Sequence, residues 1–155
     1  MKSTVELDID ARQTEVSELF ANPLNNPRWM DDLERIEPIS GELGRPGSVY
    51  RMVPREGGLG GMEFVATVVK RELPDEVRLA LQSSRVSMQA TDTFQRLSDG
   101  KTRMISEEVF TFKGLFSKVF GLMARGRIKA AHRRHIEAFK RFAETTTASP
   151  LRAVR

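Results

Sequence analysis

The chain has 155 residues, of which 39% are apolar and 30% are charged, a balance typical of one globular domain and not of a disordered or membrane-spanning chain. It contains no cysteine, which excludes disulfide frameworks, thiolate metal sites and cysteine nucleophiles. The net charge of +4 is unevenly distributed, because the part from Lys113 to the end carries +9 and the rest carries −5. No apolar run approaches the ~20 residues of a spanning helix, and residues 1–8 lack the apolar core of a signal peptide. We therefore expect a cytoplasmic protein.

The N-terminal part predicts one strand followed by two short helices. Residues 5–10 alternate between apolar and acidic side chains, as in a half-buried strand. Residues 12–21 carry apolar side chains at helical spacing, and Pro23 ends this helix. A second, very short helix is expected to begin at Pro27 and to contain Trp29, the single tryptophan.

The middle of the chain predicts an antiparallel sheet. Alternating segments follow one another with only short turn sequences between them, such as Pro74-Asp75 and Ser98-Asp99-Gly100. Short separators join neighbouring antiparallel strands, whereas a parallel sheet needs a crossover between each pair. The predicted strands cover residues 33–39, 48–53, 62–73, 77–83, 86–97 and 102–112.

The last predicted element is a long helix from residue 115 to about Ala143. Its apolar stripe is interrupted at Gly126, where we expect a kink that divides the helix into two parts. Residues 145–155 lack periodicity, and we expect a disordered tail after a single domain of residues 1–144.

This order of elements resembles the helix-grip fold of the START-like (SRPBCC) superfamily. The resemblance rests on residues 5–10 with the helix behind them, on Trp29 followed by Leu33-Glu34-Arg35-Ile36, on residues 45–52, and on Gly100-Lys101-Thr102-Arg103 with the final helix. Within the superfamily the chain is similar to the polyketide cyclase/dehydrase and lipid-transport group, with the carbon monoxide dehydrogenase-linked members as close relatives. The resemblance covers residues 3–144. It implies an α+β fold with a curved antiparallel sheet of about six to seven strands around a long C-terminal helix, and two short helices after the first strand. It also implies a hydrophobic cavity between the sheet and the helix.

Strand alternation indicates which side chains face that cavity, although the same side chains equally form a plain core. Met and aromatic residues are frequent among them, and such residues line adaptable pockets. Trp29 is expected at the cavity mouth, and residues 115–123 of the final helix are expected to seal one end. The predicted ligand-binding residues are Trp29, Tyr50, Met52, Phe64, Leu79, Met88, Phe94, Met104, Phe110, Met123 and Phe139.

Polar residues on the inward face are the candidate catalytic groups. Asp92 shares the parity of Phe94, and Glu108 is favoured over Glu107, although a one-residue shift in the last hairpin would exchange the two. His135 lies in the apolar stripe of the final helix and is expected to face the sheet. A buried carboxyl has a raised pKa and can transfer protons, alone or with an imidazole. The alternative is that these groups form structural ion pairs.

Several other functions are excluded or not expected. His132 and His135 have no third ligand at metal-site spacing, so we expect no metal and no cofactor. The glycines of residues 57–61 precede a strand and lack the Gly-Lys-Ser/Thr of a phosphate loop. The basic residues are not interleaved with stacking aromatics, so we expect no nucleic-acid partner.

Three hypotheses for the function follow. The first is a protein that binds and carries or sequesters a small hydrophobic ligand in the cavity. The second is a cyclase- or dehydratase-type enzyme that acts on a polyketide-like or aromatic substrate with Asp92, Glu108 and His135. The third is an accessory protein whose basic final helix makes peripheral contact with a membrane, without stable insertion, or docks on an acidic partner. The oligomeric state is not predicted.

Overall fold

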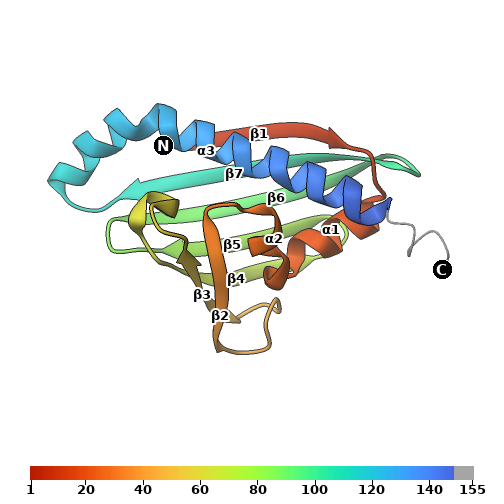
Figure 1. The fold of residues 1–155 in the computed structure, drawn as a ribbon, viewed down its shortest axis with the longest axis horizontal. Helices are drawn as coiled ribbons and strands as arrows, with labels where there is room; N and C mark the ends of the chain where they lie inside the picture. Colours follow the sequence, from red (N-terminus) through yellow and green to blue (C-terminus); the bar gives the residue numbers. More distant parts are fainter. Residues whose placement is uncertain (149–155) are drawn as a thin grey trace.

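The computed structural model describes residues 1–148, in which a seven-stranded antiparallel sheet curves around one long helix (Figure 1). This is the predicted helix-grip architecture. The order of strands across the sheet is β1-β7-β6-β5-β4-β3-β2. The strands are β1 (Lys2–Ile9), β2 (Leu33–Ser40), β3 (Val49–Pro54), β4 (Phe64–Glu72), β5 (Glu76–Gln82), β6 (Val86–Ser98) and β7 (Lys101–Phe112). The helices are α1 (Gln13–Ala21), α2 (Asn26–Trp29) and α3 (Leu115–Thr147), with single 3-10 turns η1 (Pro23–Asn25) and η2 (Gly58–Gly61).

The topology places the first two strands at opposite edges of the sheet. β2 to β7 follow one another as hairpins, and β1 pairs with β7, so that the chain must cross the concave side between β1 and β2. α1 and α2 make this crossing, and they contact β6, β2 and α3. α3 packs on β1 and β7 (Figure 1). The three helices therefore share one face of the sheet, with the core between them and the strands.

The concave side is filled by the alternate, apolar side chains of the strands. In β1, Ser3, Val5 and Ile9 are buried while Lys2, Thr4 and Glu6 are exposed. Four aromatic rings from four different elements meet in this core. The centroid of the Phe20 ring lies 5.8 Å from that of Trp29, 5.7 Å from that of Phe94 and 5.0 Å from that of Phe139. This cluster joins α1, α2 and α3 to β6.

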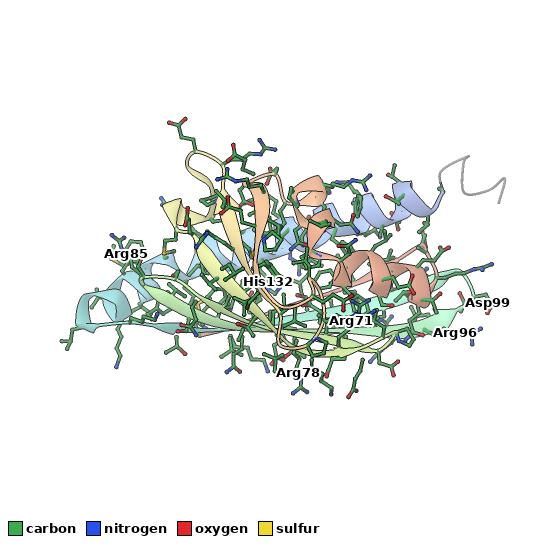
Figure 2. All side chains as sticks on the ribbon, turned by 90° about the horizontal axis from the view of Figure 1, so that it is seen from below. Arg71, Arg78, Arg85, Arg96, Asp99 and His132 are labelled. Carbon is green, nitrogen blue, oxygen red and sulfur yellow. The ribbon has the colours of Figure 1, made fainter. Side chains whose placement is uncertain are left out.

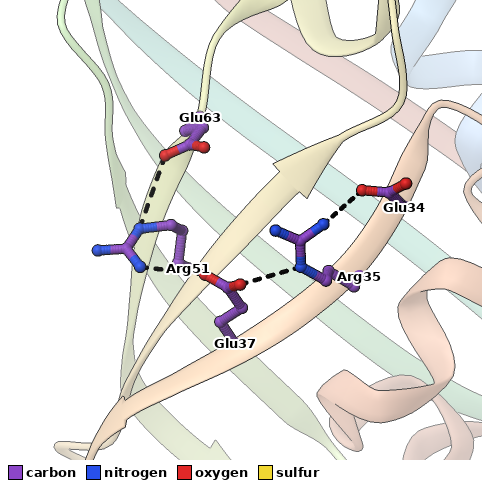
Figure 3. Close-up of polar contacts among 5 residues, drawn as sticks. All are labelled: Glu34, Arg35, Glu37, Arg51 and Glu63. Carbon is purple, nitrogen blue, oxygen red and sulfur yellow. Dashed lines mark hydrogen bonds and ion pairs between the residues drawn. The ribbon is translucent and has the colours of Figure 1, made fainter.

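Ion pairs cover the solvent side of the sheet near its β2 edge (Figure 3). The Glu37 carboxylate lies 2.9 Å from Arg35 Nε and 3.1 Å from Arg51 Nη1, and Arg51 Nε lies 3.6 Å from Glu63. Charged side chains on an edge strand discourage pairing with another chain. The network therefore protects the open edge of the sheet.

α3 differs from its prediction in three respects. The helix is continuous through Gly126, and it extends to Thr147, beyond Ala143. Residues 145–147 of the predicted tail are therefore helical, and residues 149–155 lie outside the described part of the chain. The first turns of α3 do not seal a cavity, because they lie beyond the strand ends at one end of the molecule (Figure 1). Leu115 there is 88% exposed.

Candidate functional site

A cavity of about 90 Å³ lies between the concave face of the sheet and the helices. Its wall is mostly apolar, with residues from α1, α2, β3, β4, β5, β6, β7 and α3. Five polar residues interrupt this wall: Asn26, Asp92, Ser106, Glu108 and His135. An apolar cavity with a few convergent polar groups is the usual form of a small-molecule site, although about 300–1,000 Å³ is the usual size.

Sheet register brings three of these polar residues together. Asp92 of β6 lies directly opposite Ser106 of β7, and Glu108 lies two residues further along β7 on the same face. Glu107 points to the other face, where its carboxylate lies 3.0 Å from Lys2 Nζ. The hairpin register therefore places Glu108 on the concave side, in agreement with the favoured alternative.

A buried hydrogen-bond network continues from Asp92 to α3. Ser106 hydrogen-bonds Asp92 and also lies 2.9 Å from His132 Nε2. The other ring nitrogen of His132, Nδ1, lies 2.8 Å from Ser3 Oγ of β1 and 3.7 Å from a Glu108 oxygen. His132 is only 2% exposed and lies between α3 and the sheet (Figure 2). The network thus connects the cavity floor with the helix and the edge strand.

Burial sets the protonation of this network. Desolvation raises the pKa of Asp92 to about 7, although the hydrogen bond from Ser106 opposes the shift. Desolvation, followed by the charge of Asp92, raises the pKa of Glu108 to about 8. Desolvation, with the nearby His135 and Arg133, lowers the pKa of His132 to about 4. Near neutral pH the imidazole of His132 is therefore uncharged, and the carboxyl groups of Asp92 and Glu108 change between their protonated and ionised forms.

The neutral imidazole fits between two hydroxyl groups. One ring nitrogen of a neutral histidine donates a hydrogen bond and the other accepts one. If Ser106 donates to the Asp92 carboxylate, its oxygen accepts from His132 Nε2–H, and Nδ1 then accepts from Ser3. This direction pairs both ring nitrogens of His132 and both serine hydroxyl groups.

Two buried polar atoms of the cavity wall have no hydrogen-bond partner within residues 1–148. They are Nε1 of Trp29, which is a donor, and Oδ1 of Asp92. By contrast, Tyr50 in the same wall is hydrogen-bonded by Asn26, and burial raises the pKa of its hydroxyl. Buried polar atoms are normally paired, so an unpaired donor and an unpaired carboxyl oxygen on two residues of one cavity wall are unusual.

His135 belongs to a second polar cluster at the rim of the cavity. Its Nε2 lies 2.9 Å from Asp32 Oδ1 in the loop before β2, and Arg134 lies 3.4 Å from the same carboxylate. The carboxylate's own desolvation works against the hydrogen bond and charge of His135, but the net pKa of Asp32 is lowered. Gly58 backs this loop, since a Cβ there would lie 2.3 Å from the Asp32 carbonyl oxygen.

The same cluster is the one set of possible metal donors within the described residues. Single ligand atoms of Asp31, Asp32 and His135 lie within 4.8 Å of one another. Arg134 lies 3.9 Å from Asp31 and 3.4 Å from Asp32, so its guanidinium already supplies the positive charge. The arrangement fits an ion-pair cluster that ties α3 to the α2–β2 loop.

The structure brings eight of the predicted site residues to the cavity. All three candidate catalytic residues are in its wall, but His135 turns towards Asp32 and away from the two carboxyls. The eight residues are Trp29, Tyr50, Met52, Leu79, Met88, Asp92, Glu108 and His135.

The other six predicted residues do not line the cavity. Phe64, Phe94, Met104 and Phe139 are buried in the surrounding core. Phe110 is half-buried and lines a separate groove near the start of α3. Met123 does not line the cavity, and it is 80% exposed on the first half of α3.

Sequence reasoning missed His132, Ser106 and Ser3. Ser3 shares the parity of Val5, and Ser106 shares that of Met104, so strand alternation already placed both serines inward. On α3 the buried positions include 132, 136, 139 and 143, a helical spacing that contains His132. The predicted stripe was displaced by one position around the helix.

The sequence matches the family described as polyketide cyclase / dehydrase and lipid transport over residues 1–144. The chain belongs to this family. The predicted resemblance to the START-like superfamily is confirmed with it. Among curated proteins, no match was found.

Solved structures with the same fold include a START superfamily protein from Mycobacterium smegmatis, with a TM-score of 0.78 and 13% identity over 94% of this chain and 99% of that one. An aromatase/cyclase from Streptomyces sp. R1128 has a TM-score of 0.75 and 13% identity over 97% of both chains. A conserved protein from Geobacillus kaustophilus has a TM-score of 0.74 and 11% identity, with 94% of this chain and 97% of that one covered. At these identities the likeness establishes the fold alone. Within residues 1–148 no helix has the length and apolar character needed to cross a membrane.

Proposed function

We propose that the protein binds a compact hydrophobic molecule that carries both a hydrogen-bond donor and a hydrogen-bond acceptor. The observation that carries the proposal is that two residues lining one apolar cavity, Trp29 and Asp92, each have a buried atom without a hydrogen-bond partner, Nε1 and Oδ1. A ligand acceptor would receive the indole N–H, and a ligand donor would bind the carboxyl oxygen. The family match supports a hydrophobic ligand in general terms.

The size and charge of the cavity narrow the ligand further. About 90 Å³ is smaller than the dry cavity of about 150 Å³ that binds benzene, so the ligand should be no larger than a single aromatic ring. Asp92 and Glu108 are largely protonated below pH 7, so an uncharged ligand meets uncharged carboxyls there. As pH rises through 7 and 8 the carboxyls ionise, and affinity for an apolar ligand falls.

Phenol and toluene form a matched pair of probes for this proposal. They have nearly the same size, but only phenol carries a donor and an acceptor. We expect phenol to bind about tenfold more tightly than toluene at pH 6, since a buried, otherwise unpaired group gains about 1–1.5 kcal/mol from its hydrogen bond. Titration followed by ligand NMR gives both dissociation constants.

Variants test whether the preference for phenol over toluene depends on Trp29 Nε1 and Asp92 Oδ1. Asp92→Leu and Trp29→Phe should each reduce the phenol preference, whereas Asp92→Asn, which keeps a polar group, should retain it and weaken its pH dependence. Ala90→Leu should block both probes, because Ala90 is buried in the cavity wall. Equal binding of phenol and toluene by the wild type, or binding unchanged by Ala90→Leu, would disprove the proposal.

A second candidate function is proton transfer of the cyclase or dehydratase type. It is favoured by two carboxyls with pKa values of about 7 and about 8 in the same cavity, near the pH at which a general base is most effective. An ionised Asp92 would take a proton from the carbon next to a ligand carbonyl, and Glu108 in its protonated form would hydrogen-bond the enolate oxygen.

Hydrogen–deuterium exchange of a compact ketone tests this activity without knowledge of the substrate. Cyclohexanone in heavy water should exchange its α-hydrogens faster with the wild type than with Asp92→Asn, and the rate should increase as pH rises through about 7. Glu107→Gln is the control, because Glu107 lies on the other face of the sheet and pairs with Lys2. A rate that is the same for wild type and Asp92→Asn excludes Asp92 as the base.

A further inference from the structure

The first half of α3 carries a cluster of exposed apolar side chains. Leu115, Val119, Leu122 and Met123 are between 62% and 88% exposed, and their spacing of three and four residues places them on one face of the helix. We call these four residues the apolar ridge. Phe120 beside them is 61% exposed. Single exposed apolar residues are normal, but a contiguous exposed group marks an interaction surface.

The helix turns this ridge away from the sheet because its opposite face is in contact. Gly121 is buried against Phe112 of β7, and a Cβ at Gly121 would lie 2.6 Å from that ring. The close approach fixes the rotation of the helix about its axis. The first turns of α3 lie at one end of the molecule (Figure 1), and the side chains of the ridge are exposed there.

Unpaired cations surround the ridge. Lys118, Arg125, Arg127 and Lys129 are exposed, and no carboxylate pairs with any of them within residues 1–148. No Asp or Glu occurs between Glu108 and Glu137, a segment that contains seven Lys and Arg residues. Elsewhere on the surface, arginines such as Arg35 and Arg103 lie next to carboxylates.

A groove next to the apolar ridge combines apolar side chains with positive charge. It has a volume of about 380 Å³ and lies between the end of β7 and α3. Phe110, Phe112 and Leu122 give it an apolar wall, and Lys118 and Arg125 are the charged residues in it. This is the complement of a phospholipid, in which an anionic phosphate is attached to apolar chains.

We propose that the first half of α3 docks on the surface of a membrane that contains anionic phospholipids. The apolar ridge enters the boundary between headgroups and acyl chains, and the four cations pair with lipid phosphates. A second copy of the chain is a poorer occupant, because two such patches would place like charges against each other. This function is separate from ligand binding in the cavity, although a membrane is also where a hydrophobic ligand would be collected.

Vesicle flotation tests the proposal directly. We expect the full chain to float with vesicles of phosphatidylcholine mixed with phosphatidylglycerol, and to remain in solution with phosphatidylcholine alone. Binding should weaken strongly at about 0.5 M salt, where surface charges are screened within a few ångströms. Flotation that is equal with both kinds of vesicle would contradict the electrostatic part of the proposal, and no flotation with either would refute it altogether.

Matched variants separate this patch from the net charge of the protein. The double variant Lys118→Glu/Arg125→Glu should reduce the vesicle partition coefficient roughly 30-fold or more. Each cation near an anionic surface increases binding about fivefold, and two are replaced here by acidic residues. Arg96→Glu/Lys101→Glu changes the net charge equally at the opposite end of the molecule, where Figure 2 shows Arg96, and should weaken it much less. Leu122→Ser/Met123→Ser should weaken it about tenfold or more. Equal effects of the two charge variants would mean that no docking surface exists.

A fluorescent label measures insertion without disturbing the fold. The chain has no cysteine, so Met123→Cys and Val69→Cys each give one labelling site, and both residues are exposed in the wild type. An environment-sensitive dye at position 123 should shift to shorter wavelength on anionic vesicles, whereas the dye at position 69, on the other face of the sheet, should not. If the apolar variants instead convert a dimer into a monomer and no shift occurs at position 123, the surface is a contact between copies and the proposal is wrong.

Discussion

The two halves of α3 have the same secondary structure and opposite environments. In the second half, Ile136, Phe139 and Ala143 are buried, and His132 hydrogen-bonds two strands. In the first half, Leu115 and Met123 are exposed although both are apolar. The difference follows from the sheet, since β1 and β7 lie under the second half, whereas only the first turns of α3 lie beyond the strand ends (Figure 1). Further along the first half, the contact of Gly121 with Phe112 turns the apolar ridge away from the sheet.

This comparison separates two reasons for an apolar residue on a helix. Apolar residues in the second half stabilise the fold, because they replace water with core contacts. Apolar residues in the first half cannot do so, since unfolding changes their exposure very little. The proposed docking on a membrane surface would bury them.

Alanine substitutions should give the largest contrast between the two halves of α3 in the free energy of unfolding. Phe139→Ala removes a ring in contact with Phe20, Trp29 and Phe142, and we expect a loss of about 3–5 kcal/mol in the free energy of unfolding. Met123→Ala should change it by less than about 0.5 kcal/mol. Urea unfolding monitored by circular dichroism measures both values. A large loss for Met123→Ala would show that the first half is part of the core.

The pH dependence of stability should sharpen the comparison, because only the second half of α3 contacts the titrating network. The folded pKa values of Asp92 and Glu108 are raised, so the folded state binds protons that the unfolded state does not, and stability increases by about 2 kcal/mol as pH falls from 8 to 6.5. The lowered pKa of His132 acts in the opposite direction, and its contribution is lost as pH falls from about 6.5 to about 4.

Urea unfolding at several pH values tests this dependence. The double variant Asp92→Asn/Glu108→Gln should lose the increase that the two carboxyls give as pH falls from 8, so that the loss from His132 below pH 6.5 becomes visible. Charge changes in the first half, such as Arg127→Gln, serve as the control and should leave the profile in place. A wild-type profile that is flat from pH 8 to 6.5 would mean that the carboxyls are not buried as described.

Alanine substitutions at two glycines of the first half should change the stability only slightly, and in opposite directions. Gly121→Ala places a methyl group 2.6 Å from the Phe112 ring and should cost about 1 kcal/mol despite the better helix propensity of alanine. Gly126→Ala meets nothing within 4 Å and should stabilise the protein by about 0.5–1 kcal/mol. Thermal unfolding of the two variants gives the comparison. Stabilisation by both would show that the helix does not lie on Phe112.

The fold could be predicted almost completely from the sequence, and the cavity in part. Strand alternation placed Asp92 and Glu108 on the concave side because a strand has two faces and one of them is apolar. The rotation of α3 about its axis was harder to predict, since His132 and His135 both lie near the apolar stripe. A shift of that stripe by one position exchanges the environments of the two histidines. His132 is buried in the network, and His135 contacts a loop aspartate.

Two features depend on three-dimensional packing and had no sequence signal. Phe94 has the inward parity of a ligand contact, but Phe20 of α1 packs against it and excludes it from the cavity. Met123 has the helical spacing of a core residue, but the contact of Gly121 with Phe112 turns that face of α3 away from the sheet. Periodicity shows which side of an element is apolar, and it does not show what covers that side.

The position of Trp29 has a practical consequence. It is the single tryptophan of the chain, it lies in the cavity wall, and its ring stacks on Phe20 and meets Phe139 edge-on. Intrinsic fluorescence excited at the indole band therefore reports on one site in the whole molecule. A ligand that binds Nε1 would change the emission spectrum at once, so the protein can be screened against chemical libraries with no added dye.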